Sequence, residues 1–116
     1  MTPQILISFD VEEFDMPLEY GFNLQRDKQL EIGFLGLEAI TPLLNQSDFR
    51  ATLFTTANFA DHFSSSIKHL SDNHEIASHT YYHSFFEIEH LQSSRLRLEQ
   101  ITGKPVTGLR MPRMKQ

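Results

Sequence analysis

The feature that most constrains this chain is a regular alternation of short β-forming runs with longer stretches of helical periodicity. The runs predicted as strands are 5–9, 50–56, 75–78 and 106–109. The stretches predicted as helices, where apolar residues recur every three or four positions, are 30–45, 58–71 and 87–101. Such alternation favours parallel strands joined by right-handed helical crossovers, so the predicted fold class is α/β.

Proline, glycine and serine mark the expected interruptions. The stretch 15–26 has no periodicity and contains Pro17 and Gly21, which indicates a long loop of a length that is often functional. Pro42 can bend the end of the first predicted helix, and the serines at 64–66 can break the second. The polar residues of interest follow the first, third and fourth predicted strands, where an α/β barrel or doubly wound sheet places its chemistry.

Length and composition limit what the chain can be. Its 116 residues suffice for one domain or part of one. With 10 basic and 15 acidic residues its formal charge is -5, which disfavours nucleic acid as a partner. Cysteine is absent, so any metal must be held by histidine and carboxylate. The first residues lack a signal peptide pattern and no apolar stretch could span a bilayer, so we expect a cytoplasmic protein without a membrane anchor.

Two pairs of polar residues could build a metal site. His79 and His83 follow the third predicted strand, on a loop or the start of a helix, and are four apart, a spacing that on a helical turn puts both imidazoles on one face. Asp10 and Glu12 are two apart, so on an extended strand both carboxylates face one side. Two histidines and one carboxylate suit a catalytic zinc or related divalent ion, and the other carboxylate could act as a base in amide or ester hydrolysis. Taken singly, the histidines could instead be surface or core residues, and the acids a solvated strand end.

One arginine could complete this site. Arg110 ends the fourth predicted strand and could hold a carboxylate ionised and oriented. A surface cation is the alternative for Arg110, and it is our interpretation of Arg113. The remaining histidines have no carboxylate at a readable spacing and are interpreted as surface residues: His62, His69, His74 and His90.

Taken in order, three motifs resemble the polysaccharide deacetylase family, the group of chitin, chitooligosaccharide and peptidoglycan deacetylases. Residues 8–12, SFDVE, are similar to its first motif in the form Asp-x-acid. Residues 79–83, HTYYH, fit its second motif, and the preceding EIAS at 75–78 is a familiar flank. Residues 110–112, RMP, resemble its third motif, and RATLF at 50–54 resembles the second strand of that fold.

The resemblance implies a role for each motif residue. Asp10 would be the general base, Glu12, His79 and His83 the metal ligands, and Arg110 the residue that orients the base. Val11 stands where the common form of the first motif has a second aspartate. The family's later motifs, which supply a hydrophobic wall for the acetyl group and a general-acid histidine, have no counterpart in the 116 residues.

The fold implied by the resemblance is the N-terminal part of a distorted (β/α) barrel. A barrel of this type needs roughly 200 residues or more, so residues 1–116 would form a partial domain of about four parallel strands alternating with helices. Self-association is expected, because two chains could cover the open sheet edges of a half barrel. The apolar run 106–109 at the open end motivates this hypothesis.

Three functions remain open at this point. The first is a metal-dependent hydrolase of non-peptide carbon–nitrogen bonds that removes N-acetyl groups from carbohydrates. The second is a hydrolase of small cyclic or linear amides, since some relatives of the family act on such compounds. The third is a truncated, non-catalytic relative that binds metal or sugar.

Overall fold

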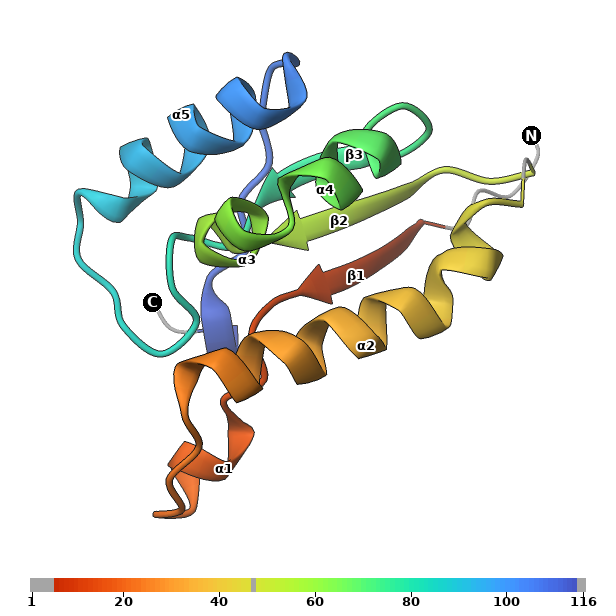
Figure 1. Ribbon diagram of the computed structural model, residues 1–116. Helices are drawn as coiled ribbons and strands as arrows, with labels where there is room; N and C mark the ends of the chain where they lie inside the picture. Colours follow the sequence, from red (N-terminus) through yellow and green to blue (C-terminus); the bar gives the residue numbers. More distant parts are fainter. Residues whose placement is uncertain (1–5, 47, 115–116) are drawn as a thin grey trace.

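Three of the predicted strands pair into one parallel sheet. The computed structural model describes residues 6–46 and 48–114; Ile5, the expected start of the first strand, lies outside these ranges, as do the first four residues and Ser47. The strands are β1 (Ile7–Val11), β2 (Ala51–Thr55) and β3 (Glu75–Ser78). Their order is β1-β2-β3, with β2 in the centre (Figure 1). The α/β fold class predicted from the sequence is therefore confirmed.

The helices lie between and after these strands. They are α1 (Met16–Glu19), α2 (Arg26–Leu44), α3 (Ala57–His62), α4 (Ser64–Leu70) and α5 (His90–Thr102), and a short 3-10 turn, η1, covers Pro112–Met114. In Figure 1, α2 runs alongside β1, whereas α5 lies at the opposite side of the molecule. None of the helices in the described ranges has the length and apolarity needed to cross a bilayer.

The two faces of the sheet have different environments. On β2, Ala51, Leu53 and Thr55 are buried and belong to the face covered by helices, whereas Thr52 and Phe54 on the other face are only half-buried. The core holds apolar side chains from every strand and every long helix (Val11, Leu30, Leu37, Leu44, Leu53, Phe59, Ile67, Ile76 and Leu98). The helix-free face therefore keeps side chains accessible for chemistry.

The fourth predicted strand is wrong in its extent. Residues 106–109 make only one bridge to the sheet, from Leu109 to Ser78 in parallel orientation. The reason is local: the Val106 N–H donates to the Glu99 side chain at 2.9 Å instead of to a neighbouring strand. Only at its end does the segment reach β3, where the Ser78 N–H donates to the Gly108 carbonyl at 2.8 Å. The sheet has three strands within the described residues, not the four expected.

The expected interruptions occur, with shifted positions. The second predicted helix breaks at Phe63, which has φ -129° and ψ 45° and separates α3 from α4 just before the serine run. The expected loop 15–26 contains the short helix α1. The first predicted helix begins four residues earlier than expected, at Arg26, and includes Pro42 in its last turn.

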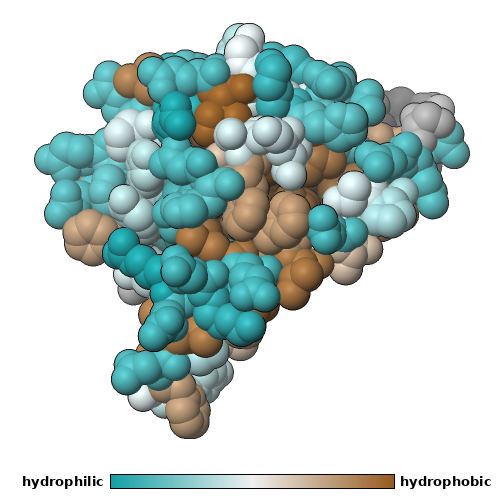
Figure 2. All heavy atoms as spheres, viewed as in Figure 1, coloured by the Kyte–Doolittle hydropathy of each residue, from teal (hydrophilic) through white to brown (hydrophobic). Residues whose placement is uncertain are grey.

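Apolar side chains gather between α2 and the pair α3–α4, as brown spheres in the middle of Figure 2 show. Phe34 of α2 stacks on Phe63, with 4.4 Å between ring centres. Phe63 also contacts Phe59 of α3 at 4.8 Å. These rings join α2 to the helices that follow β2, and so hold β1 and β2 side by side.

The interpretation of His74 as a surface residue is wrong. Its ring is 2% exposed and connects two segments. The Ala51 N–H donates to Nδ1 at 3.0 Å, which leaves the proton on Nε2 to be donated to the Leu44 carbonyl at 2.7 Å. His74 therefore connects the end of α2 to the start of β2 by hydrogen bonds, a role that its spacing in the sequence does not indicate.

Candidate metal centre

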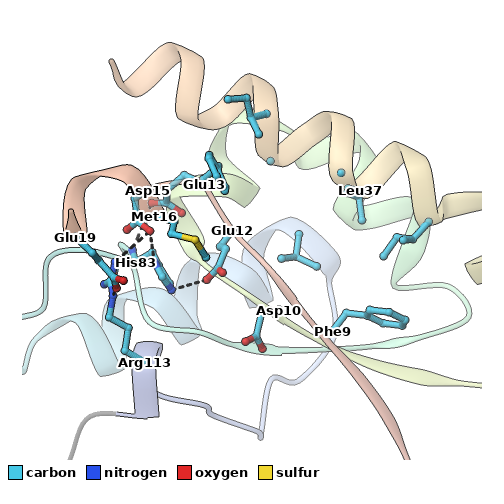
Figure 3. Close-up of a pocket in the computed structure, with 16 residues that line it drawn as sticks. Phe9, Asp10, Glu12, Glu13, Asp15, Met16, Glu19, Leu37, His83 and Arg113 are labelled. Carbon is cyan, nitrogen blue, oxygen red and sulfur yellow. Dashed lines mark hydrogen bonds and ion pairs between the residues drawn. The ribbon is translucent and has the colours of Figure 1, made fainter. Parts of the chain in front are cut away.

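The carboxylates of Asp10 and Glu12 project from the same side of β1, while Phe9 between Ser8 and Asp10 points to the other side (Figure 3). Asp10 pairs with Phe54 in the parallel register, on the face away from the helices. Alternation along an extended strand accounts for this placement, as predicted from the sequence. Both carboxylates line a pocket of about 550 Å³ that β1 and α2 share.

His79 and His83 reach the same point from the loop after β3. Residues 79–83 form an irregular loop, one of the two placements expected from the sequence, so the spacing of four does not reflect a helical turn. The loop turns at Thr80, a fully buried residue with φ 60°, in the left-handed region that costs a β-branched residue energy. Its backbone is held by α3, since the Ala57 N–H donates to the Thr80 carbonyl at 3.1 Å. The two imidazoles lie 5.5 Å apart.

Three side chains converge with the ligand atoms that a metal needs. One atom each of Glu12, His79 and His83 lies within 4.8 Å of the others. Glu12 Oε2 is 3.0 Å from His79 Nε2 and 2.8 Å from His83 Nε2. Glu12 Oε2 and His79 Nε2 are buried and have no hydrogen-bond partner among the described residues. Because unsatisfied buried polar atoms are costly, this arrangement fits a divalent cation between the three groups.

The Nδ1 atom of each imidazole lies within hydrogen-bond distance of an acceptor. His79 Nδ1 lies 2.8 Å from the Arg110 carbonyl, and His83 Nδ1 lies 2.6 Å from Asp15 Oδ1. Since a carbonyl or carboxylate oxygen can only accept, each Nδ1 carries the proton and donates it. When its ring is neutral, each histidine therefore has a free lone pair on Nε2, the tautomer that a metal-binding histidine requires.

The charges around the three groups are strongly coupled. Burial acts to raise the pKa of Glu12, but the adjacent imidazoles of His79 and His83 stabilise its carboxylate and lower that pKa to about 2. Burial acts to lower the pKa of His83, but Glu12 and Asp15 outweigh it and raise the pKa above its usual 6.5. In the absence of a cation, a proton on His83 therefore balances the Glu12 carboxylate.

Arg110 is directed at Asp10. Its Nη1 donates to Asp10 Oδ1 at 2.7 Å, and its Nη2 donates to Ser8 Oγ at 2.8 Å. The guanidinium carbon lies 4.1 Å from the centre of the Phe54 ring, which supports it from β2. Asp10 Oδ2 lies 3.9 Å from His79 Nε2, so this carboxylate is beside the cluster but outside it.

Two further acids, to which the sequence patterns assigned no role, follow Asp10 and Glu12 in the same acidic run. Glu13 and Asp15 are 5% and 3% exposed. Glu13 accepts hydrogen bonds at 2.7 Å from Thr56 and Asn58, which joins the end of β1 to the start of α3. Asp15 holds His83. The density of acids within six residues, at positions 10, 12, 13 and 15, was the available indication of a built site.

Arg113 is not the free surface cation expected from the sequence. It ion-pairs with Glu19, donates to Asp15 at 3.2 Å, and donates to the His83 carbonyl at 3.0 Å. These bonds join the segment after the Ser78–Leu109 bridge to the segments after β1 and β3. The ion pair with Glu19 and the contact of Asp15 with His83 are drawn in Figure 3.

Comparison with known families agrees with the motifs. The sequence model described as polysaccharide deacetylase matches residues 36–116, which is more than half of the chain. The chain therefore belongs to the polysaccharide deacetylase family. A search of curated proteins gave no significant match.

Solved structures share the fold at low sequence identity. A CE4 family pseudoenzyme from Bacillus anthracis superposes with a TM-score of 0.67 at 19% identity over 95% of this chain and 35% of that one. An allantoinase gives 0.68 at 19% identity over 90% of this chain and 44% of its own. A family 4 acetyl xylan esterase from Clostridium thermocellum, in complex with a cobalt ion, gives 0.62 at 15% identity over 96% and 49%. The chain thus matches part of a CE4 (β/α) barrel and spans less than half the length of each relative.

Proposed function

We propose that this chain carries the metal-binding part of a hydrolase site that removes N-acetyl groups from carbohydrates. The observation that carries the proposal is the convergence of Glu12, His79 and His83, with two buried ligand atoms that have no hydrogen-bond partner among the described residues. Membership of the polysaccharide deacetylase family supports the substrate class, an N-acetylated carbohydrate.

Glu12, His79 and His83 would hold a divalent ion, of which zinc is the first choice for one carboxylate and two imidazoles. A bound ion of this kind supplies Lewis-acid chemistry, polarising a carbonyl oxygen and lowering the pKa of water. Asp10 would act as general base, accepting the proton of the water that attacks the acetyl carbonyl carbon. Arg110 would keep Asp10 ionised and aimed at that proton, through the 2.7 Å bond it donates.

Two alternative functions each have an observation in their favour. The structural likeness to an allantoinase favours hydrolysis of a small amide as the second candidate. The likeness to a CE4 family pseudoenzyme favours a non-catalytic protein that binds metal or sugar. Both alternatives share the fold with the main proposal: the first differs from it in the compound that is hydrolysed, and the second hydrolyses none.

Self-association and a cytoplasmic location remain predictions. Among the described residues β1 pairs only with β2, so its other side is an open edge of the sheet. Near the opposite edge, three large apolar side chains are exposed: Phe85, Ile88 and Leu109. A second copy of the chain is the occupant we propose for this surface. A monomer in light scattering at micromolar concentration would contradict that part of the proposal.

The metal site is tested by elemental analysis and by calorimetric titration of the chelator-treated chain with zinc. About one ion per chain is expected, and His79→Ala should abolish tight binding because it removes a buried ligand. His62→Ala is the matched control, since His62 is exposed and its Nδ1 hydrogen-bonds to the Asn58 carbonyl within its own helix. Equal zinc affinity in the parent chain and His79→Ala would refute the site.

Substrate class is tested on the zinc-loaded protein. Release of acetate from N-acetylglucosamine oligomers, compared with hydrolysis of a cyclic amide such as allantoin, separates the first two functions. Zinc binding without turnover of either compound would favour the non-catalytic alternative.

A further inference from the structure

We propose that Asp15 is a positioning residue of the metal centre, which fixes the His83 ring so that its Nε2 faces Glu12 and His79. The inference rests on the proposed function, because it assigns a role within the same site. Neither the sequence motifs nor the comparisons assign a role to Asp15.

The contact itself is short and buried. Asp15 Oδ1 lies 2.6 Å from His83 Nδ1, and the two side chains are 3% and 12% exposed. A carboxylate at Nδ1 keeps the proton on that nitrogen and leaves the Nε2 lone pair free for a metal. It also prevents a ring flip, since a flipped ring would place a carbon atom against the buried carboxylate. His83 is therefore held in the one orientation and tautomer that suit the cluster.

Asp15 is itself held on several sides, which makes it a rigid support. Ser84 donates to its Oδ2 and Arg113 donates to its Oδ1 at 3.2 Å. The Leu18 N–H donates to the Asp15 backbone carbonyl at 3.0 Å and anchors the residue at the start of α1. A buried carboxylate with this many donors, one of them a cation, has the compensation that burial of charge demands.

The two histidines differ in what supports them. His79 is supported by a main-chain acceptor, the Arg110 carbonyl, which no side-chain substitution removes directly. His83 is supported by a side chain, so its orientation depends on residue 15. The asymmetry identifies Asp15 as a side chain through which the orientation of His83, and with it metal affinity, can be changed without altering any ligand.

The experiment compares the zinc affinity of the full chain with that of Asp15→Ala and Asp15→Asn, by calorimetry at fixed pH and with circular dichroism as a check on folding. Asp15→Ala is expected to weaken zinc binding by about 10- to 100-fold, the usual effect of removing an outer-shell partner. Asp15→Asn should lose less, because its amide oxygen can still accept the Nδ1–H. Glu19→Gln is the matched control: it removes a charge that pairs with the same Arg113 but does not contact His83, so zinc affinity should stay unchanged.

A folded Asp15→Ala chain that binds zinc as tightly as the parent would overturn the inference while leaving the metal site intact. An equal loss in Glu19→Gln would also overturn it, because the effect would then be one of charge alone. A parent chain that binds no zinc would overturn both the inference and the proposed function. Should Asp15→Ala fail to fold, nitrogen-15 NMR of the zinc-loaded parent decides: a proton on His83 Nδ1 and zinc on Nε2 are expected, and the reverse arrangement overturns the inference.

Discussion

Arg110 donates a 2.7 Å hydrogen bond from Nη1 to Asp10 Oδ1, although the two residues are 100 positions apart in the sequence. The bond crosses from the segment after the Ser78–Leu109 bridge to β1, over the ring of Phe54. It fixes a carboxylate that lies beside the metal cluster without belonging to it. Asp10 and the three ligand residues can therefore be separated by mutation.

Asp10→Asn is expected to leave zinc affinity unchanged and to lower hydrolysis by about 10²- to 10⁴-fold, the usual contribution of a general base. Arg110→Lys should lower hydrolysis by a smaller factor, because a lysine cannot make the paired contacts of the guanidinium with Asp10 and Ser8. Calorimetry and a deacetylation assay on the same preparations provide the measurements. Loss of zinc from Asp10→Asn would contradict its assignment as a base.

The stability of the metal-free chain should depend on pH on both sides of a maximum. The folded-state pKa of Glu12 is lowered from 4.5 to about 2, so its stabilisation is present above pH 4.5 and is lost as the pH falls towards 2. The folded-state pKa of His83 is raised above 6.5, so its stabilisation is complete below pH 6.5 and is lost as the pH rises through the raised value. Stability should therefore be greatest between about pH 4.5 and 6.5.

Urea unfolding in the presence of a chelator, repeated across this pH range, measures the effect. His83→Gln is the informative variant, since it cannot be protonated and should lose the decline on the alkaline side. Saturating zinc should remove the alkaline decline as well, because a metal would replace the proton between His83 and Glu12. An alkaline decline that persists unchanged in His83→Gln would assign it to another group.

The sequence predicted those parts of the fold and site that depend on local patterns. Alternation placed β2 and β3 correctly, and the i, i+2 rule put Asp10 and Glu12 on one side of β1. The sequence-based prediction was less accurate where a segment had to pair with a distant part of the chain. The Val106–Leu109 run has strand composition, but its first N–H is taken by Glu99, a contact that composition does not reveal.

The same limit explains the polar residues that were missed. Asp15 and Arg113 are 98 positions apart in the sequence, where each has the pattern of an ordinary surface charge. Only the fold brings both of them to His83. His74, unlike the exposed His69, has two main-chain groups hydrogen-bonded to its ring. Hydrogen bonds between distant segments are set by tertiary geometry, so residue type and spacing could not predict them.

His74 gives a stability prediction that is independent of the metal site. His74→Ala removes the ring that joins the Ala51 N–H to the Leu44 carbonyl, leaving both groups buried without a partner. Destabilisation of about 2 to 4 kcal/mol is expected, with zinc affinity unchanged in the folded protein. His69→Ala, at an exposed position of α4, is the control and should change stability little. Chemical denaturation monitored by circular dichroism measures both, and equal stability of the two variants would contradict the role of His74.

Gly33 and Gly36 of α2 form a matched pair for the last prediction. A Cβ at position 33 would lie 2.3 Å from the Glu12 carbonyl oxygen, a main-chain atom that cannot move aside, whereas a Cβ at position 36 would meet nothing within 4 Å. Gly33→Ala should therefore push α2 away from the end of β1, destabilise the chain by about 1 to 3 kcal/mol, and weaken zinc binding by displacing Glu12. Gly36→Ala should instead stabilise the chain by up to about 1 kcal/mol through helix propensity.

Thermal and chemical denaturation of the two alanine variants, followed by zinc titration, tests the close packing of α2 on the metal-bearing strand. Opposite signs of the two stability changes are the expected result, because the same substitution in the same helix differs only in what the added methyl group contacts. If Gly33→Ala matched Gly36→Ala in stability and in zinc affinity, α2 would not pack against the Glu12 backbone as closely as the structure has it.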